Sequence, residues 1–226
     1  MSLGWLRNFR SLFLIEVCPL CDRPAEEILC RACETQLQRC RLAQPEAFWQ
    51  GESPLLVWGN YGGILKRAIA AMKYENHPEI AELLGEFLGR AWLDVSPSLP
   101  KMVVVPVPMN PEKRKQRGFD QAELIARSFC RQTGFPLKCQ GLQRVKETQP
   151  LFDLNPQERE LMMRDAFALG KDFQKERSRL PVLLVDDLYT TGNTVKAGAK
   201  TLSRAGIRVG GIAAVASPRG KATDKR

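Results

Sequence analysis

Residues 182–194 constrain the fold more than any other stretch, because they join a short apolar run, two carboxylates and a loop of hydroxyls and glycine. The run from Val182 to Val185 is typical of a buried strand, and a segment with helical periodicity begins at Thr194. A strand that leads through a tight loop into a helix brings free backbone N–H groups to the carboxyl edge of a parallel sheet. The stretch therefore predicts an α/β domain with an anion site at that edge.

The polar residues of this loop indicate the kind of ligand. Backbone N–H groups from about Tyr189 to Thr194 can hold a terminal phosphate. The candidate phosphate-binding residues are Thr190, Thr191, Gly192, Asn193 and Thr194. Asp186 and Asp187 would repel that phosphate, so we expect them to serve ribose hydroxyls and a hydrated Mg²⁺. The whole pattern resembles the signature for phosphoribosyl pyrophosphate (PRPP) in type I phosphoribosyltransferases, and it fits neither a Walker A loop nor a dinucleotide-binding loop.

The rest of the chain alternates strand-like and helix-like segments. Strands are expected at residues 55–58, 101–107 and 209–216, and helices at residues 64–73, 78–92, 120–130 and 194–204. This alternation predicts a βαβ arrangement with a mostly parallel sheet. We expect two parts: residues 1–50 with an N-terminal helix and a cysteine module, and residues 51–226 as a phosphoribosyltransferase-like domain.

A basic loop is expected from Pro108 to Gly118, directly after a buried strand. Its cations are Lys113, Arg114, Lys115 and Arg117, in a chain of net charge +9. Beside the PRPP strand, Arg117 could stabilise a departing pyrophosphate, with Asp186 and Asp187 as the other candidate catalytic residues. Single-stranded nucleic acid is the competing ligand, with Phe119 available to stack a base. An ordinary solvated charge run is the third interpretation, and the sequence does not decide among them.

Four cysteines form two short-spaced pairs near the N-terminus. They are Cys18, Cys21, Cys30 and Cys33. Two C-x-x-C pairs can enclose one tetrahedral Zn²⁺, and four protein thiolates leave no open position for catalysis. We therefore expect a structural zinc site in a reducing compartment. The apolar run from Leu12 to Ile15 is too short for a signal peptide or a membrane span, so a cytoplasmic location is expected.

Taken together, these motifs resemble the ComF (competence protein F) family of phosphoribosyltransferase-like proteins. The resemblance rests on the cysteine pairs, V-P-V-P at residues 105–108, R-G-F-x-Q at residues 117–121 and V-D-D-x-x-T-T-G at residues 185–192. It implies a protein that acts in the uptake or use of extracellular DNA, with direct single-stranded DNA binding and a DNA-uptake helicase as a partner. The chain departs from the family pattern at Asp120 and Met162, where Asn is usual.

Two further functions remain open beside a role in DNA uptake. One is an active phosphoribosyltransferase that transfers ribose 5-phosphate from PRPP to an unknown acceptor. The other is a sensor that binds PRPP or a nucleotide without turnover. The loop at residues 182–194 is compatible with all three.

Overall fold

The computed structural model describes residues 17–48, 54–95, 101–145, 166–174 and 178–218. The expected N-terminal helix at residues 1–17, apart from Val17, and the departure from the family pattern at Met162 lie outside these ranges. None of the helices within the described ranges combines the length and the apolar character that crossing a bilayer requires.

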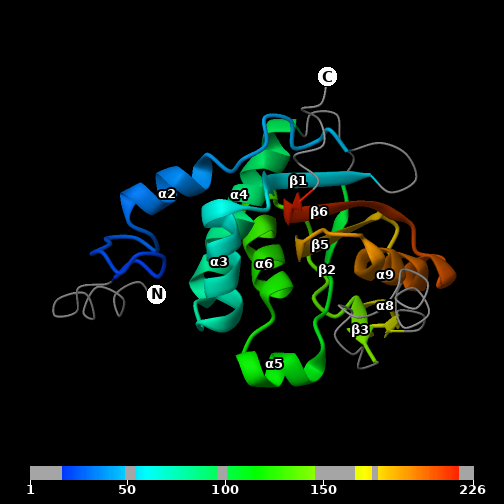
Figure 1. Ribbon diagram of the computed structural model, residues 1–226. Coiled ribbons are helices and arrows are strands. Elements are labelled where there is room, and N and C mark those ends of the chain that lie inside the picture. Colours follow the sequence, from blue (N-terminus) through cyan, green and yellow to red (C-terminus); the bar gives the residue numbers. More distant parts are fainter. Residues whose placement is uncertain (1–16, 49–53, 96–100, 146–165, 175–177, 219–226) are drawn as a thin grey trace, which may run out of the picture.

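A four-stranded parallel sheet forms the centre of the protein (Figure 1). Its strands, in spatial order, are β1 (Leu55–Asn60), β6 (Val209–Ser217), β5 (Val182–Leu188) and β2 (Val103–Pro106). All three neighbouring pairs are parallel, so the predicted α/β class with a mostly parallel sheet is confirmed. Strand β5 continues to Leu188, so both carboxylates lie on the strand, whereas the sequence suggested that it ends before them.

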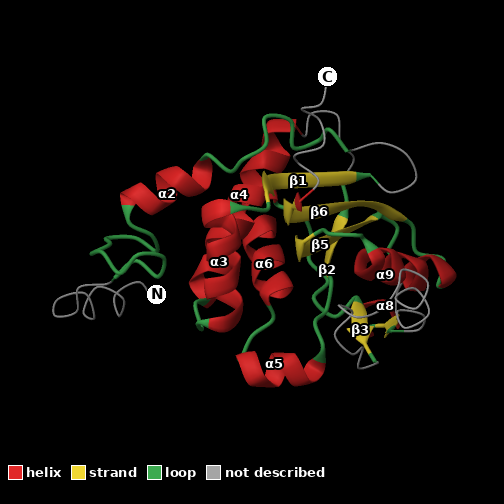
Figure 2. Ribbon diagram, in the orientation of Figure 1, coloured by secondary structure: helices red, strands yellow, loops and turns green. Residues whose placement is uncertain are grey.

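Helices cover both faces of this sheet because its strands are apolar on both sides (Figure 2). Helices α3 (Gly63–Tyr74), α4 (Pro78–Val95) and α6 (Gln121–Thr133) pack on one face, against alternate strand residues such as Val104 and Leu183. The other face packs against α9 (Asn193–Arg204) through residues such as Val105 and Leu184. The same side carries α8 (Lys171–Gln174) and the antiparallel pair β3 (Leu142–Arg144) and β4 (Phe167–Leu169).

Helices α4 and α6 approach each other closely because α4 has glycine at two contact positions. A Cβ atom on Gly85 would lie 2.4 Å from the carbonyl oxygen of Ile125, and one on Gly89 would lie 2.7 Å from Cβ of Gln132. The close contact holds α6 firmly, and α6 carries residues of the candidate site at its N-terminal end.

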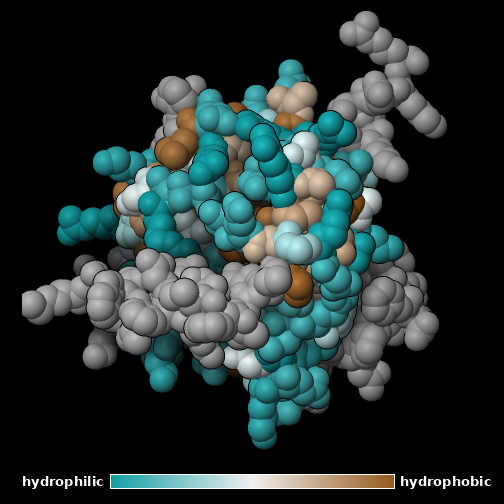
Figure 3. Space-filling model, turned by 90° about the vertical axis from the view of Figure 1, so that its left-hand side faces the viewer, coloured by the Kyte–Doolittle hydropathy of each residue, from teal (hydrophilic) through white to brown (hydrophobic). Residues whose placement is uncertain are grey.

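The N-terminal module packs on α3 and on the outer edge of the sheet. Helix α2 (Arg31–Gln38) contacts α3, and Leu20 and Leu37 are fully buried in the same hydrophobic cluster as that helix. The chain then runs beside β1, where the Leu42 N–H donates to the Trp58 carbonyl at 2.8 Å. On the α2 and α3 side of the molecule, apolar residues form small patches between hydrophilic ones (Figure 3). The division at residue 50 stays a prediction.

The segment expected to be a basic loop contains a short helix, α5 (Pro111–Arg117), so this prediction was wrong. The Asn110 side chain accepts hydrogen bonds from the N–H groups of Glu112 and Lys113, and proline occupies the first turn. Gly118 ends the helix at φ 82°, in the left-handed region that glycine adopts without strain. The sequence contains the start signal Asn110-Pro111 and the stop signal Gly118, but the run of charged residues between them was interpreted as a loop.

Candidate functional site

The loop between β5 and α9 is closed by Gly192, which has φ 78° and forms the N-cap of α9. A Cβ atom on Gly192 would lie 2.4 Å from the hydroxyl oxygen of Tyr189. The Tyr189 side chain is itself buried. Both the backbone angle and the close contact therefore require glycine here. The loop holds Thr190 and Thr191 exposed to solvent, while Asn193 and Thr194 are half-buried.

The first turn of α9 offers unused backbone donors. The first helical hydrogen bond runs from the Lys196 N–H to the Gly192 carbonyl at 2.8 Å. The N–H groups of Asn193, Thr194 and Val195 therefore have no acceptor within the helix, and the N-cap Gly192 has no side chain that could cap it. The positive end of the helix dipole adds to their attraction for an anion.

A cavity of about 200 Å³ lies beside this helix end. Its wall includes Thr194 of α9, Asp186 of β5 and Gln121 of α6. Cationic side chains complete it from three other elements: Lys73 of α3, Lys113 and Arg117 of α5, and Arg144 of β3. Sequence-distant elements thus converge on one polar, mainly cationic cavity, which suits a phosphorylated ligand.

The two adjacent carboxylates have different surroundings, because successive strand residues point to opposite faces. Asp186 lines the cavity, whereas the Asp187 carboxylate forms an ion pair with Lys73 Nζ at 2.5 Å. The Gln121 amide also donates to Asp187 Oδ1 at 3.4 Å. The structure therefore brings only Asp186 into the cavity wall, and the direct role expected of Asp187 towards ligand stays a prediction.

Burial and charge shift the protonation of this group of residues. Burial, and then the nearby Asp187 carboxylate, raise the pKa of Asp186 well above its usual range. Burial alone would lower the pKa of Lys73, but Asp187 and Asp186 outweigh it and raise that pKa. Lys73 is therefore a firmly charged ammonium whose partner is a carboxylate only 5% exposed.

Arg117 reaches the cavity from the last turn of α5. Its Nη1 donates to the Gln121 side-chain oxygen at 2.5 Å, and its guanidinium lies 5.8 Å from the centre of the Tyr74 ring. Arg117 and Asp186 therefore lie in the wall of the same cavity, and the catalytic role expected of them stays a prediction. Gln121 links Arg117 to Asp187 as a bridging amide.

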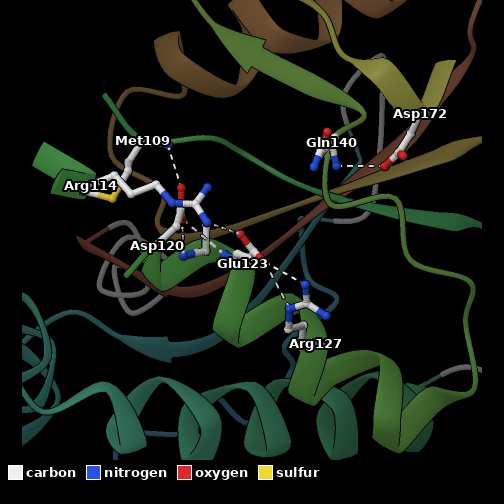
Figure 4. Close-up of polar contacts among 8 residues, drawn as sticks. Met109, Arg114, Asp120, Glu123, Arg127, Gln140 and Asp172 are labelled. Atoms are coloured by element: carbon white, nitrogen blue, oxygen red, sulfur yellow. Dashed lines mark hydrogen bonds and ion pairs between the residues drawn. The ribbon is translucent and has the colours of Figure 1, made fainter. Parts of the chain in front are cut away.

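Polar contacts tie α5 and the residues before it to the start of α6 (Figure 4). Asp120 accepts from the N–H groups of Ala122 and Glu123 as the N-cap of α6, and from the Met109 N–H at 3.1 Å. Arg114 pairs with Glu123 at 3.0 Å. Asp caps a helix as well as Asn does, so the departure from the family pattern at this position keeps the local structure.

Phe119 was considered as a base-stacking residue, but it packs half-buried against the helical core. Tyr74 at the end of α3 is instead 78% exposed. The exposed aromatic ring beside α5 is thus that of Tyr74, at the end of α3.

The four cysteines come together as the sequence predicted. Their sulfur atoms all lie within 4.8 Å of one another. A tetrahedral zinc ion with bonds of about 2.3 Å needs sulfurs roughly 3.8 Å apart, so the set fits one such ion. The Cys21 N–H and the Asp22 N–H both donate to the Cys18 carbonyl, at 3.1 and 2.9 Å, which folds the first pair into a tight turn.

The second cysteine pair uses the start of α2, where Cys30 is the N-cap and Cys33 lies in the first turn. This position favours thiolates, because the helix dipole is positive there. Arg23 donates to the Cys21 sulfur at 3.3 Å and lowers the pKa of that thiol to about 6. Burial raises the pKa of Cys33 to about 12. A bound cation would hold all four as thiolates.

Among the residues of the cavity wall that the sequence did not single out are Lys73, Gln121 and Arg144. In the sequence, Lys73 is only the last residue of the expected helix at residues 64–73, and Gln121 is only part of the R-G-F-x-Q motif. Arg144 lies outside the strands and helices expected from the sequence, and its placement depends on the β3–β4 pairing. Burial lowers the pKa of Arg144, and Asp186 opposes that shift.

Known proteins resemble the chain in sequence over most of its length. A scan against protein-family models finds no match. Competence protein ComFC of Bacillus subtilis is 28% identical over 191 residues, which are 84% of this chain and 72% of that protein. Competence protein F of Haemophilus influenzae is 27% identical over 203 residues, covering 84% and 86%. DNA utilization protein YhgH of Salmonella typhimurium is 28% identical over 196 residues, covering 85% and 80%.

Among solved structures, adenine phosphoribosyltransferase from Leishmania donovani matches with a TM-score of 0.39 at 12% identity, over 84% of this chain and 81% of that one. A TM-score this low supports no inference about activity. The sequence matches to proteins of three bacteria, by contrast, cover most of this chain and most of each relative. They confirm that this chain is homologous to the competence protein F group, as its motifs predicted.

Proposed function

We propose that this protein binds PRPP with Mg²⁺ beside α9 and takes part in the uptake or use of DNA. One observation supports the ligand most strongly: free N–H groups at the start of α9, a carboxylate and several cations share one cavity wall. A 5′-phosphate fits the helix end, the ribose hydroxyls fit Asp186, and a pyrophosphate fits Arg117 and Lys113. Relatives named for competence and DNA utilization support the biological role.

Mg²⁺ would arrive as part of the ligand. Asp186 is the described carboxylate that lines the cavity, and one carboxylate with substrate phosphates is a usual set for this hydrated ion. When bound, the ion neutralises the pyrophosphate charge. Asp187 then serves the site through Lys73, whose ammonium it holds at the cavity wall.

The cysteine module holds one structural Zn²⁺ in this proposal. Four thiolates from this chain fill a tetrahedral shell, so the ion stabilises the fold of residues 18–33 and takes no part in chemistry. The remaining elements of the proposal are single-stranded DNA on the basic α5 surface, a DNA-uptake helicase partner and a cytoplasmic location.

An active phosphoribosyltransferase is the second candidate. Arg117 is the residue that favours it, because a guanidinium beside the pyrophosphate position can stabilise the departing charge. Incubation with PRPP, Mg²⁺ and a panel of bases and amines, with detection of released pyrophosphate, separates turnover from binding alone.

Calorimetry with PRPP, with and without Mg²⁺, tests the binding proposal. Thr191→Val should weaken binding by about 1–2 kcal/mol, because it removes one hydroxyl donor to a charged phosphate. Ser203→Ala, at the opposite exposed end of α9, is the matched control and should bind as the wild type does. Equal affinities for wild type and Thr191→Val would contradict the assignment of the phosphate to this loop.

A further inference from the structure

A second cavity, of about 370 Å³, adjoins the first between the ends of α3 and α5. Its wall is made of Lys73, Tyr74, Asn76, Lys113, Gln116 and Arg117. Its volume lies within the range of about 300–1,000 Å³ that is usual for small-molecule sites. Figure 1 shows α5 beyond the ends of α3 and α6, so this cavity lies at the rim of the domain.

Tyr74 sets this cavity apart from an ordinary charged surface. Among the described residues, it is the one aromatic side chain that is largely exposed, at 78%. A tyrosine ring this exposed offers an apolar face for stacking and a polar hydroxyl at its tip. Arg117 approaches the ring at 5.8 Å from its centre, and the high exposure shows that most of the ring surface remains open.

The rest of the wall supplies the other contacts that a nucleotide needs. No carboxylate lines the cavity among the described residues, while Lys113 and Arg117 offer cations for a phosphate. Asn76 and Gln116 carry amides, which both donate and accept hydrogen bonds as the edge of a base requires. The cavity thus combines an aromatic ring, cations and amides.

We propose that this cavity is a nucleobase subsite, in which a base stacks on Tyr74 while its phosphate contacts Lys113 and Arg117. This inference goes beyond PRPP binding at α9, but the two sites share part of their walls. Lys73, Tyr74, Lys113 and Arg117 line both cavities, so the cations assigned to the phosphate of the base also belong to the cavity proposed for PRPP. The base can belong to a single strand or to a free nucleotide, since both present the same ring and phosphate.

The test compares two oligonucleotides of about a dozen nucleotides, the length range of single-strand sites. One is oligothymidylate and the other is an abasic strand with the same phosphates. Fluorescence anisotropy gives their affinities for the full chain in the absence of PRPP. Tyr74→Ala should weaken oligothymidylate binding by about 5- to 100-fold and leave abasic binding unchanged, because only the stacking contact is lost.

Tyr74→Phe is the matched control, because it keeps the ring and should bind oligothymidylate as tightly as the wild type. Thymidine monophosphate, measured by calorimetry, identifies the source: a Tyr74 dependence as large as that of the strand assigns the subsite to a free nucleotide. The proposal is overturned if Tyr74→Ala weakens both strands equally, weakens neither, or if the wild type binds none of these probes. PRPP calorimetry on the same samples shows separately whether the α9 site works.

Discussion

The cysteine module and the cavity beside α9 differ in how far apart their residues lie in the sequence. All four cysteines fall between residues 18 and 33, where one tight turn and the start of α2 bring their sulfurs within 4.8 Å. The cavity instead joins residues from Lys73 to Thr194, carried by six elements. The cysteine cluster therefore depends mainly on residues close in the chain, whereas the cavity exists only once the sheet and its helices are packed.

Removing the metal should have the largest effect and should stay local. Structural zinc contributes an apparent free energy of about 10–16 kcal/mol in small modules at pH 7, so chelation should unfold the region around residues 18–33. Metal analysis should find about one zinc per chain. Hydrogen exchange should then show lost protection in α2 and retained protection in α4 and α6 after chelation.

Two serine variants sharpen this prediction. Cys33→Ser removes a ligand and should release the metal, while Cys40→Ser changes a cysteine outside the cluster and should keep it. A Cys33→Ser protein that still carries a full equivalent of zinc would contradict the four-ligand assignment.

Breaking the Lys73–Asp187 pair should have the next largest effect, and it acts on the cavity. Lys73→Met leaves a carboxylate only 5% exposed without its partner, which costs about 3–5 kcal/mol when a buried pair is broken. The double variant with Asp187→Asn should recover part of this loss, because no buried charge is left unpaired. Urea denaturation gives the free energy of unfolding for each protein.

Lys66→Met is the matched control, because Lys66 is an exposed lysine on the same helix. It should change the free energy of unfolding by no more than about 0.5 kcal/mol. If Lys73→Met were as mild as this control, the ion pair would be irrelevant to the stability of the cavity.

Replacing Asp186 should change the free energy of unfolding less than replacing Lys73, because the Asp186 side chain can keep its proton. Its folded pKa is raised by burial and by Asp187, with Asp120 adding and Lys73 opposing. The folded protein thus binds this proton more tightly than the unfolded chain, where the pKa is about 3.9. The stability that the proton contributes is therefore lost as the pH rises through the raised folded pKa.

Asp186→Asn should remove that loss, so its free energy of unfolding should fall less than that of the wild type between about pH 4 and pH 8. Asp94→Asn, on an exposed carboxylate paired with Arg41, should keep the wild-type profile in this range. Parallel profiles for wild type and Asp186→Asn would show that folding does not raise the pKa of Asp186.

The same contrast explains what the sequence could predict. The cysteine cluster and the β5–loop–α9 unit depend on residues close in the chain, so C-x-x-C spacing and the D-D-x-x-T-T-G pattern were enough. Lys73 and Arg144 reach the cavity only through helix and sheet packing, which leaves no local signal. The pairing of Asp187 with Lys73 could not be predicted, because β5 runs three residues further than its apolar run and alternation turns the Asp187 side chain towards Lys73.

The smallest expected effect concerns the cations of α5, and it separates two faces of one helix. Lys113 lines both cavities, whereas Lys115 lines neither, although both lysines are exposed. Replacing either with alanine should leave the free energy of unfolding within about 0.5 kcal/mol of the wild type. For single strands, each neutralised phosphate contributes about 0.7 to the slope of log affinity against log salt concentration. Lys113→Ala should therefore reduce that slope by about 0.7 for oligothymidylate, and Lys115→Ala should not change it. A slope that changes equally in both variants would mean that the strand follows the whole basic surface and not the cavity side of α5.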